Sequence, residues 1–178
     1  MLRVVLDTTV FCSDFTLSRD SALKLLESAR NGNVAIHVSE VVIAETKRRF
    51  DEDLRNEGRS LSDKARNFIN GRFGSVFEVD IHASVQSAQV AYPELLDGIL
   101  HGNGVIIEDF PQVSHEEVVR RDLERKLPFR SGKDKPSSGY RDSLIWLTVL
   151  DIGSRYKDDQ IVFVTANSDD YTDNRRKS

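Results

Sequence analysis

The chain has 178 residues, of which 39% are hydrophobic and 30% are charged, and its formal net charge is -4 at pH 7. These values are typical of one globular domain, and the net charge excludes a general attraction for nucleic acid, so any such binding must depend on local basic patches. Cys12 is the only cysteine, which excludes an internal disulfide and a cysteine-based zinc site.

The sequence has no pattern typical of a membrane or secreted protein. No apolar run approaches the roughly 18 residues of a membrane span. The first residues also lack the basic and then apolar plan of a signal peptide. We therefore expect a cytoplasmic protein without a membrane segment.

The N-terminal residues predict the beginning of an α/β fold. Val4-Val5-Leu6 is an apolar run typical of a strand buried on both faces, and Asp7 follows it directly. The spacing of Ala and Leu over 21–29 predicts a helix, and the run over 34–38 predicts a second buried strand. These elements form a βαβ unit, which should be right-handed.

The middle of the chain has weaker patterns. Ser39 is a suitable N-cap for a helix over 41–50, which ends in charged residues. The apolar run over 105–107 fits either a strand or a buried loop. The other elements expected here are a helix over 61–69, a short strand over 76–79, a helix over 83–92 that Pro93 interrupts, and its continuation over 94–100.

The C-terminal half returns to clear patterns. Ser114 and Glu117 have the spacing of a capping box and predict a helix that ends at Leu127-Pro128. After a basic loop, the nearly all-apolar run over 144–152 predicts a central buried helix. The run over 161–164 predicts another buried parallel strand, so the fold class is α/β with a parallel sheet.

Acidic residues stand at positions where this fold would gather them. Asp7 follows the first strand, and Asp169-Asp170 follows the last, and the carboxyl ends of parallel strands share one edge of the sheet. Glu45 comes after four apolar residues of its helix, so part of its turn must face the core. Asp142 lies in the first turn of the most hydrophobic helix, where the helix dipole favours a negative charge.

Each acid also has a simple structural explanation. Asp7 can cap the turn that follows it, and Asp142 can serve only as a favourable charge at its helix N-terminus. Glu45 can extend to solvent, and Asp is common in polar loops such as that of Asp169 and Asp170. These alternatives remain open for each acid taken singly, whereas their joint position favours a shared crevice.

Clustered carboxylates require a cation or retained protons. Two unit charges about 4 Å apart repel by about 4 kcal/mol at an effective dielectric constant of about 20. A ligand set of oxygens without His or Cys suits Mg²⁺ or Mn²⁺. These ions activate water and stabilise charge on a phosphodiester, so hydrolysis of a nucleic-acid backbone fits the acids best.

Four segments carry a resemblance to the PIN domain, the fold of many metal-dependent ribonucleases, including VapC-type toxins of toxin–antitoxin pairs. They are Val4–Val10, Ser39–Glu45, Arg141–Ile145 and Val164–Tyr171, the last of which is similar to the Thr-x-Asn-x-x-Asp-Phe ending of the family. The resemblance implies a three-layer α/β/α fold around a central parallel sheet. It also implies a single domain over 1–172.

The resemblance also implies a site. Asp7, Glu45, Asp142 and Asp170 would bind Mg²⁺ or Mn²⁺ and the attacking water, with Asp169 as an alternative ligand. The residues expected to orient these acids through hydrogen bonds are Thr8, Thr9, Thr165 and Asn167.

The chain departs from the family pattern at several points. Thr9 stands where the family usually has Asn, and Tyr171 stands where Phe is common. The region from about 51 to 135 is longer than in compact toxins, and 127–142 resembles a larger PIN-like subgroup. Members often continue past the last acid, so the polar basic tail at 173–178 is a candidate boundary within a longer chain.

Basic residues near the acids are candidates for binding an RNA backbone, although solvated surface charge is the simpler explanation for any one of them. They are Lys47, Arg48, Arg49, Arg130, Lys133, Lys135 and Arg141. RNA is the expected substrate, with single-stranded DNA as an alternative and an antitoxin or a second copy as candidate partners. The bases of 120–126 lie among acids and are expected to form helix ion pairs.

Two other functions compete with a nuclease. A catalytically silent PIN-like module would serve as a binding or scaffold domain. A phosphatase of the haloacid-dehalogenase type also begins with an Asp after a strand, but it needs a second acid where this chain has Thr9. A nucleotide-binding Rossmann domain is disfavoured, since no Gly-rich turn follows the first strand.

Overall fold

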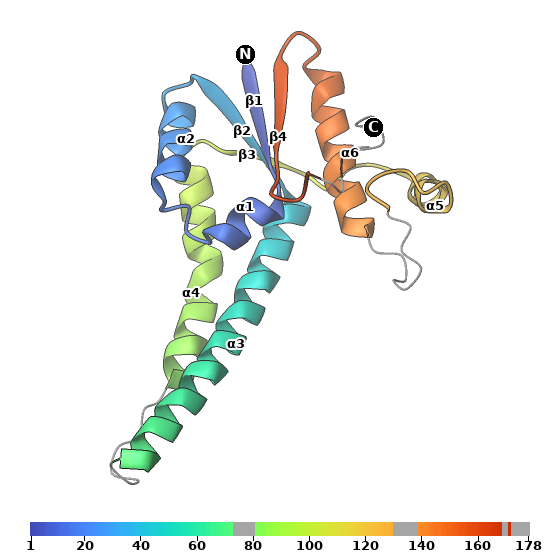
Figure 1. The fold of residues 1–178 in the computed structure, drawn as a ribbon. Coiled ribbons are helices and arrows are strands. Elements are labelled where there is room, and N and C mark those ends of the chain that lie inside the picture. Colours follow the sequence, from blue (N-terminus) through green and yellow to red (C-terminus); the bar gives the residue numbers. More distant parts are fainter. Residues whose placement is uncertain (73–80, 130–138, 169–170, 172–178) are drawn as a thin grey trace, which may run out of the picture.

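The fold comes from a computed structural model that describes residues 1–72, 81–129, 139–168 and 171. Figure 1 shows the arrangement of its elements. The strands are β1 (Leu2–Leu6), β2 (Val34–Ser39), β3 (Ile106–Glu108) and β4 (Gln160–Val164). The helices are α1 (Thr8–Ser13), α2 (Asp20–Arg30), α3 (Glu40–Arg72), α4 (Ile81–Gly102), α5 (His115–Leu123) and α6 (Tyr140–Arg155).

The four strands form one parallel sheet in the order β3-β2-β1-β4. Val5 of β1 is in register with His37 of β2 on one side and with Phe163 of β4 on the other. The predicted α/β class with a central parallel sheet is therefore confirmed. Because all strands run the same way, the residues that follow β1, β2 and β4 lie at the same edge.

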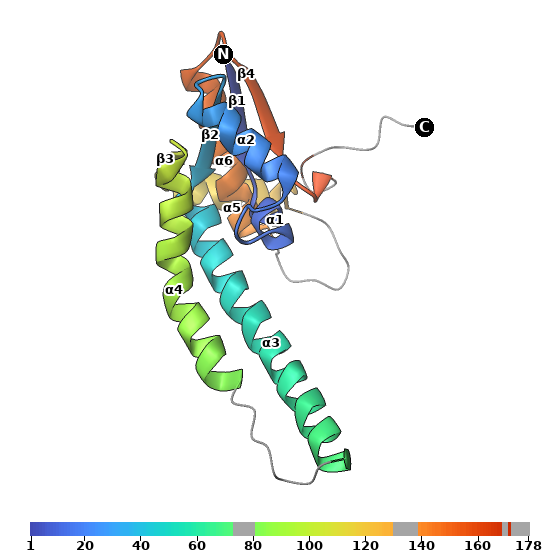
Figure 2. The same ribbon diagram turned by 90° about the vertical axis from the view of Figure 1, so that its left-hand side faces the viewer.

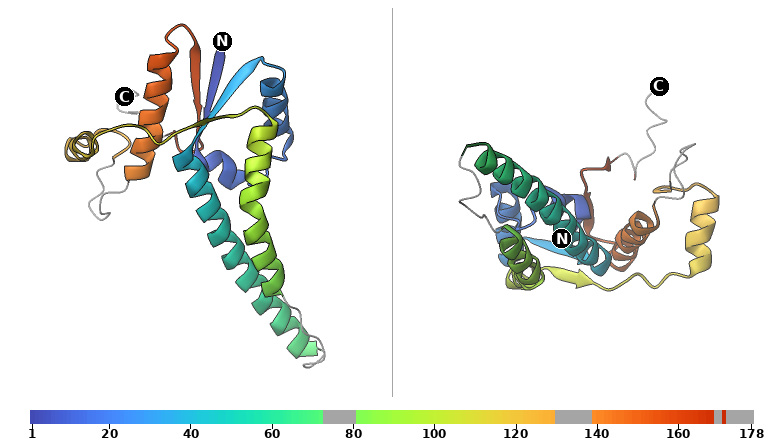
Figure 3. Two further views of the ribbon diagram at one scale, coloured as in Figure 1. Left: turned by 180° about the vertical axis from the view of Figure 1, so that it is seen from behind. Right: turned by 90° about the horizontal axis from the view of Figure 1, so that it is seen from below.

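The two faces of the sheet are covered by different helices. Val4 packs in the same apolar cluster as Leu26 of α2 and Leu96 of α4, whereas Val5 packs with Ile152 of α6. This alternation follows from the strand period of two residues. Figures 1 and 3 show α2 and α4 on one side of the sheet and α6 on the other, which confirms the three-layer arrangement.

Helices α3 and α4 form a long antiparallel pair that extends away from the sheet (Figures 1 and 2). The prediction of separate helices over 41–50 and 61–69 is wrong, because α3 is continuous from Glu40 to Arg72. The predicted interruption at Pro93 is also absent. Tyr92 and Leu96 are buried on either side of Pro93, and their packing outweighs the hydrogen bond that Pro cannot donate.

The other elements differ from expectation only in detail. The run over 105–107, which fitted a strand or a loop, contributes to β3, and the strand predicted over 76–79 lies outside the described residues. Helix α1 was not predicted, since its six residues include several of low helix propensity. Helix α6 begins at Tyr140 and leaves Leu150 exposed, so it is buried on one side and not all round.

Helix α5 has the predicted capping box and ion pairs but not the predicted C-terminal end. The Ser114 hydroxyl accepts a hydrogen bond from the Glu117 backbone N–H at 3.2 Å, as the capping box predicts. The Glu117 carboxylate binds Arg120 and Arg121, and the pairs Arg125–Asp122 and Lys126–Glu124 complete the expected ion pairs. The helix nevertheless ends at Leu123, ahead of the predicted end at Leu127-Pro128.

No helix in the described parts of the chain is both long enough and apolar enough to cross a membrane.

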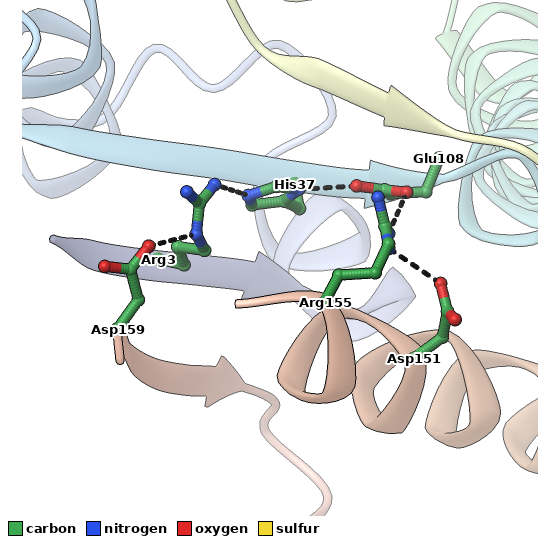
Figure 4. A network of polar contacts seen from close by, with 6 residues as sticks. All are labelled: Arg3, His37, Glu108, Asp151, Arg155 and Asp159. Atoms are coloured by element: carbon green, nitrogen blue, oxygen red, sulfur yellow. Dashed lines mark hydrogen bonds and ion pairs between the residues drawn. The ribbon is translucent and has the colours of Figure 1, made fainter. Parts of the chain in front are cut away.

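A row of alternating charges crosses the α6 face of the sheet (Figure 4). His37 is fully buried, with Nδ1 2.6 Å from Glu108 Oε1 and Nε2 3.2 Å from Arg3 Nη1. Because a guanidinium only donates, Nε2 must accept, and the neutral ring carries its proton on Nδ1. In spatial order the row is Asp159, Arg3, His37, Glu108, Arg155 and Asp151.

Burial lowers the pKa of the His37 imidazole below its usual value, although the hydrogen bond and charge of Glu108 oppose this effect. The unfolded chain therefore takes up a proton at this residue at higher pH than the folded chain does. We expect the free energy of unfolding to fall as the pH drops below about 6.5, the unperturbed pKa of His.

Urea denaturation of the wild type and His37→Gln between pH 8 and pH 5 checks this expectation. Replacement of the fully buried ring by a flexible amide should lower the stability at pH 8 through lost packing and lost rotamer freedom, but should flatten the decline toward acid pH. His115→Gln, at an exposed position of α5, is the control and should keep the wild-type decline. Equal declines in the wild type and His37→Gln would contradict the assignment.

The contact between α3 and α4 depends on Gly58. A Cβ atom added there would lie 2.7 Å from Cγ2 of Val85, whereas one added at Gly98 would meet nothing within 4 Å. Replacement of a helical Gly by Ala normally stabilises a protein by about 0.5–1 kcal/mol. We expect this gain for Gly98→Ala and its loss or reversal for Gly58→Ala, because Val85 is β-branched and has few rotamers.

Thermal and urea unfolding of the two variants, and of Gly58→Ala combined with Val85→Ala, test this packing. The free energy of unfolding of the double variant should be higher than the value expected if the effects of the two single changes were added. Strictly additive effects would show that the helices do not approach each other at Gly58.

Candidate functional site

Asp7 lies at the carboxyl end of β1, where its backbone N–H donates to the Val164 carbonyl of β4 at 3.0 Å. The residue is only 3% exposed, and its Oδ2 accepts hydrogen bonds from Thr9 Oγ1 at 2.8 Å and Thr165 Oγ1 at 2.7 Å. Although Asp7 is the N-cap residue of α1, its side chain makes no capping hydrogen bond. Among the described residues, both partners bind Oδ2, which leaves Oδ1 available to a ligand.

The direction of these hydrogen bonds is fixed by the backbone. Thr9 Oγ1 accepts from the Ala166 N–H at 2.9 Å, and Thr165 Oγ1 accepts from the Asn167 N–H at 3.0 Å. Each hydroxyl therefore has its own proton free to donate to Asp7. Thr9 thus binds Asp7 directly at the position where the family usually has Asn. Asn167 contributes its backbone, and its side chain is exposed.

Glu45 lies in the second turn of α3, and Ser39, the last residue of β2, caps this helix by accepting from the Val42 N–H at 3.3 Å. Glu45 is 9% exposed, so it faces inward and does not extend to solvent. Its Oε2 accepts from Thr8 Oγ1 at 3.2 Å. Because Thr8 follows Asp7, this bond ties the acid after β1 to the acid on α3.

Three guanidinium groups surround the other carboxylate oxygen of Glu45. Arg141 Nη1 is 2.7 Å from Oε1, and Arg48 and Arg49 have nitrogens 3.6 Å and 3.8 Å from it. Arg48 also pairs with Glu52. Arg48 and Arg49 stand three and four residues after Glu45, a spacing that favours ion pairs on a helix, so the sequence contains a signal for these two contacts beside the predicted contact with RNA.

Lys47 faces elsewhere. Its Nζ lies 3.0 Å from Asp97 of α4, so the structure separates it from Arg48 and Arg49. Of the three consecutive bases predicted to line the site, two therefore face Glu45 and one does not.

Asp142 lies in the first turn of α6 and is half-buried. Its neighbour Arg141 binds Glu45, so this turn of α6 lies against α3. Asp7, Glu45 and Asp142 thus come from three segments at one end of the sheet. However, no three His, Cys, Asp or Glu residues in the described parts of the chain are grouped closely enough to hold a metal ion.

The remaining predicted site residues cannot be placed. Asp169, Asp170, Arg130, Lys133 and Lys135 lie outside the described residues. Tyr171 is described, and its ring packs against Phe163 and Trp146 with centroid separations of 4.9 Å and 5.8 Å.

The electrostatic environment of the site extends to Cys12 of α1. Burial raises the pKa of this thiol, Arg49 opposes the shift, and the charges of Asp53, Glu45 and Asp7 add to it.

Two buried hydroxyls beside the acids were not predicted. Thr46 follows Glu45 and Ser143 follows Asp142, and neither side chain has a hydrogen-bond partner among the described residues. Ser and Thr often stand next to an acid in sequences, so this pattern did not predict that the hydroxyls of Thr46 and Ser143 would be buried.

The donor set fits a hard divalent cation. Asp7 and Glu45 are buried acids held by hydroxyl donors, and their oxygens are the ligands that Mg²⁺ and Mn²⁺ prefer. The chemistry of the residues therefore suits the cation, while the described residues by themselves do not complete its ligand set.

Comparison with known proteins gives one match. The family model of the PIN domain matches residues 4–171, which include every candidate acid. Searches of curated proteins and of solved structures gave no match. The chain therefore belongs to the PIN domain family, whose members are generally nucleases that use divalent metal ions.

Proposed function

We propose that this PIN domain is an endoribonuclease that requires Mg²⁺ or Mn²⁺. The observation that carries the proposal is the buried Asp7 carboxylate, which two threonine hydroxyls orient through one oxygen while the other oxygen remains available. A carboxylate fixed in this way is oriented to bind a ligand.

The proposed metal ligands are Asp7, Glu45, Asp142 and Asp170, with Asp169 as an alternative to the last. When bound, the cation would lower the pKa of a water molecule and stabilise charge on the scissile phosphate. The protein supplies the orientation: Thr9 and Thr165 hold Asp7, and Thr8 holds Glu45.

Arg48, Arg49 and Arg141 are the proposed contacts for the RNA backbone. They place three positive charges around the single buried charge of Glu45, and Glu52 offsets only one of them. Once a divalent cation offsets the charge of the acids, these guanidinium groups would attract a phosphate. Lys47 is removed from this set, because it pairs with Asp97.

A catalytically silent binding module is the second candidate. Two observations favour it: the described residues contain no complete three-ligand group, and three arginines lie around Glu45. A phosphatase of the haloacid-dehalogenase type is no longer a candidate, because the family is that of PIN domains and Thr9 serves as a partner of Asp7.

The first test is cleavage of a mixed RNA pool by the wild type and Asp7→Asn, with Mn²⁺ and with EDTA. An Asn oxygen can still accept from Thr9 and Thr165, so we expect the fold to be kept at equal or slightly higher stability. Cleavage should fall by about 100-fold or more, the size of effect seen when one electrostatic group of an active site is lost.

Asp97→Asn is the matched control, since it neutralises an acid that pairs with Lys47 away from the site, and it should cleave like the wild type. Undiminished cleavage by Asp7→Asn would exclude the proposed site. If the wild type cuts neither RNA nor single-stranded DNA, the silent module becomes the better explanation.

The second test compares Arg49→Ala with Lys47→Ala in RNA binding, measured by fluorescence anisotropy at several salt concentrations in EDTA. Loss of one phosphate contact should weaken binding and reduce the slope of log K against log salt by about 0.7 for a single strand. Lys47→Ala should change neither quantity. Equal effects of both variants would mean that the bases act only through net charge.

A further inference from the structure

The contact between Arg141 and Glu45 joins an exposed cation to a buried acid. Arg141 is 52% exposed on the first turn of α6, yet its Nη1 lies 2.7 Å from Oε1 of Glu45, which is 9% exposed. Arg48 and Arg49 approach the same oxygen only to 3.6 Å and 3.8 Å, beyond hydrogen-bond distance. Arg141 is therefore the direct partner of this oxygen.

A metal ion on Glu45 would lie close to the guanidinium of Arg141. Oε2 accepts from Thr8 and Oε1 from Arg141, so a cation on either oxygen of this carboxylate would stand beside that positive charge. A guanidinium and a divalent cation on one carboxylate repel each other strongly in a partly buried site. The metal and Arg141 must therefore compete for Glu45.

A displaced Arg141 would keep its charge and its position beside the acids. Its backbone lies in the first turn of α6, directly before Asp142, so its guanidinium stays at the rim of the site whichever partner it binds. A guanidinium binds phosphate oxygens as well as it binds a carboxylate. An RNA phosphate is thus the natural second partner.

We propose that Arg141 couples metal binding to RNA binding: without a metal, Glu45 holds its guanidinium, and a divalent cation on Glu45 releases it to an RNA phosphate. This inference rests on the proposed function. Since coupling between two ligands is reciprocal, RNA must also tighten metal binding. The protein would then hold RNA firmly only when the metal is in place.

The experiment compares the wild type, Arg141→Gln and Arg49→Gln. Arg49→Gln is the matched control, because it removes the same charge beside Glu45 without removing the direct contact. Calorimetry with Mn²⁺ alone gives the metal affinity. Anisotropy with a short phosphorothioate RNA, with and without Mn²⁺, gives the coupling, and gel analysis shows whether that RNA remains intact.

We expect saturating Mn²⁺ to tighten RNA binding by the wild type about tenfold, within the range typical of coupled sites. In Arg141→Gln this factor should fall to about twofold or less, and Mn²⁺ alone should bind several-fold more tightly than to the wild type. Arg49→Gln should retain most of the wild-type coupling. Thermal unfolding in EDTA should show a lower midpoint for Arg141→Gln, and Mn²⁺ should remove that difference.

Unchanged coupling in Arg141→Gln, or a Mn²⁺ affinity that stays equal or becomes weaker, would overturn the inference. Arg141→Lys provides a second variant that keeps the charge, and it should show partial coupling. The outcomes separate this inference from the proposed function. If Mn²⁺ does not bind the wild type, both the inference and the proposed function are wrong. If Mn²⁺ supports cleavage and Asp7→Asn abolishes it, the proposed function holds. Normal coupling between Mn²⁺ and RNA in Arg141→Gln would then exclude only the role of Arg141.

Discussion

The pairing of β1 with both β2 and β4 is the constraint on which the candidate site depends. The two parallel ladders fix the residues that follow each strand at one edge of the sheet. The hydrogen bond from Asp7 N–H to the Val164 carbonyl continues the β1–β4 ladder one residue beyond β1. Thr165, almost the whole chain away in sequence, thereby reaches the Asp7 carboxylate. A slip of one residue in this register would turn Asp7 to the other face of the sheet.

Contacts between α3 and α4 close to the sheet impose a second constraint on the site. Phe50 of α3 stacks on Tyr92 of α4 with ring centroids 3.7 Å apart, and the Tyr92 hydroxyl donates to the Phe15 carbonyl at 2.9 Å. These contacts fasten α3 close to the turn that carries Glu45. Glu45 therefore has little freedom to adjust, and adaptation to a ligand falls to the exposed side chain of Arg141.

The sequence predicted the parts of the molecule that local chemistry determines. Apolar runs such as Val4-Val5-Leu6 mark buried parallel strands, and acids directly after such runs must lie at the sheet edge. The middle of α3 carries no such signal, because it is polar, and its continuity depends on packing against α4 at positions such as Gly58. The partners of His37 were likewise beyond prediction, since they depend on the β2–β3 register and on the end of α6.

Within the candidate site, the expected threonines bind Asp7 and Glu45, whereas the arginines around Glu45 were not predicted as its partners. Asp7 and Glu45 are buried at the expected edge. The spacing of Arg48 and Arg49 from Glu45 was a usable signal for their contacts, whereas nothing in the sequence indicated that Arg141 would neutralise the same acid. A buried carboxylate that lost these partners would be costly, whereas a carboxylate bound too firmly by them would exclude a cation. Arg141 reconciles these demands, because its exposed side chain can leave Glu45 without any change in the packing of the core.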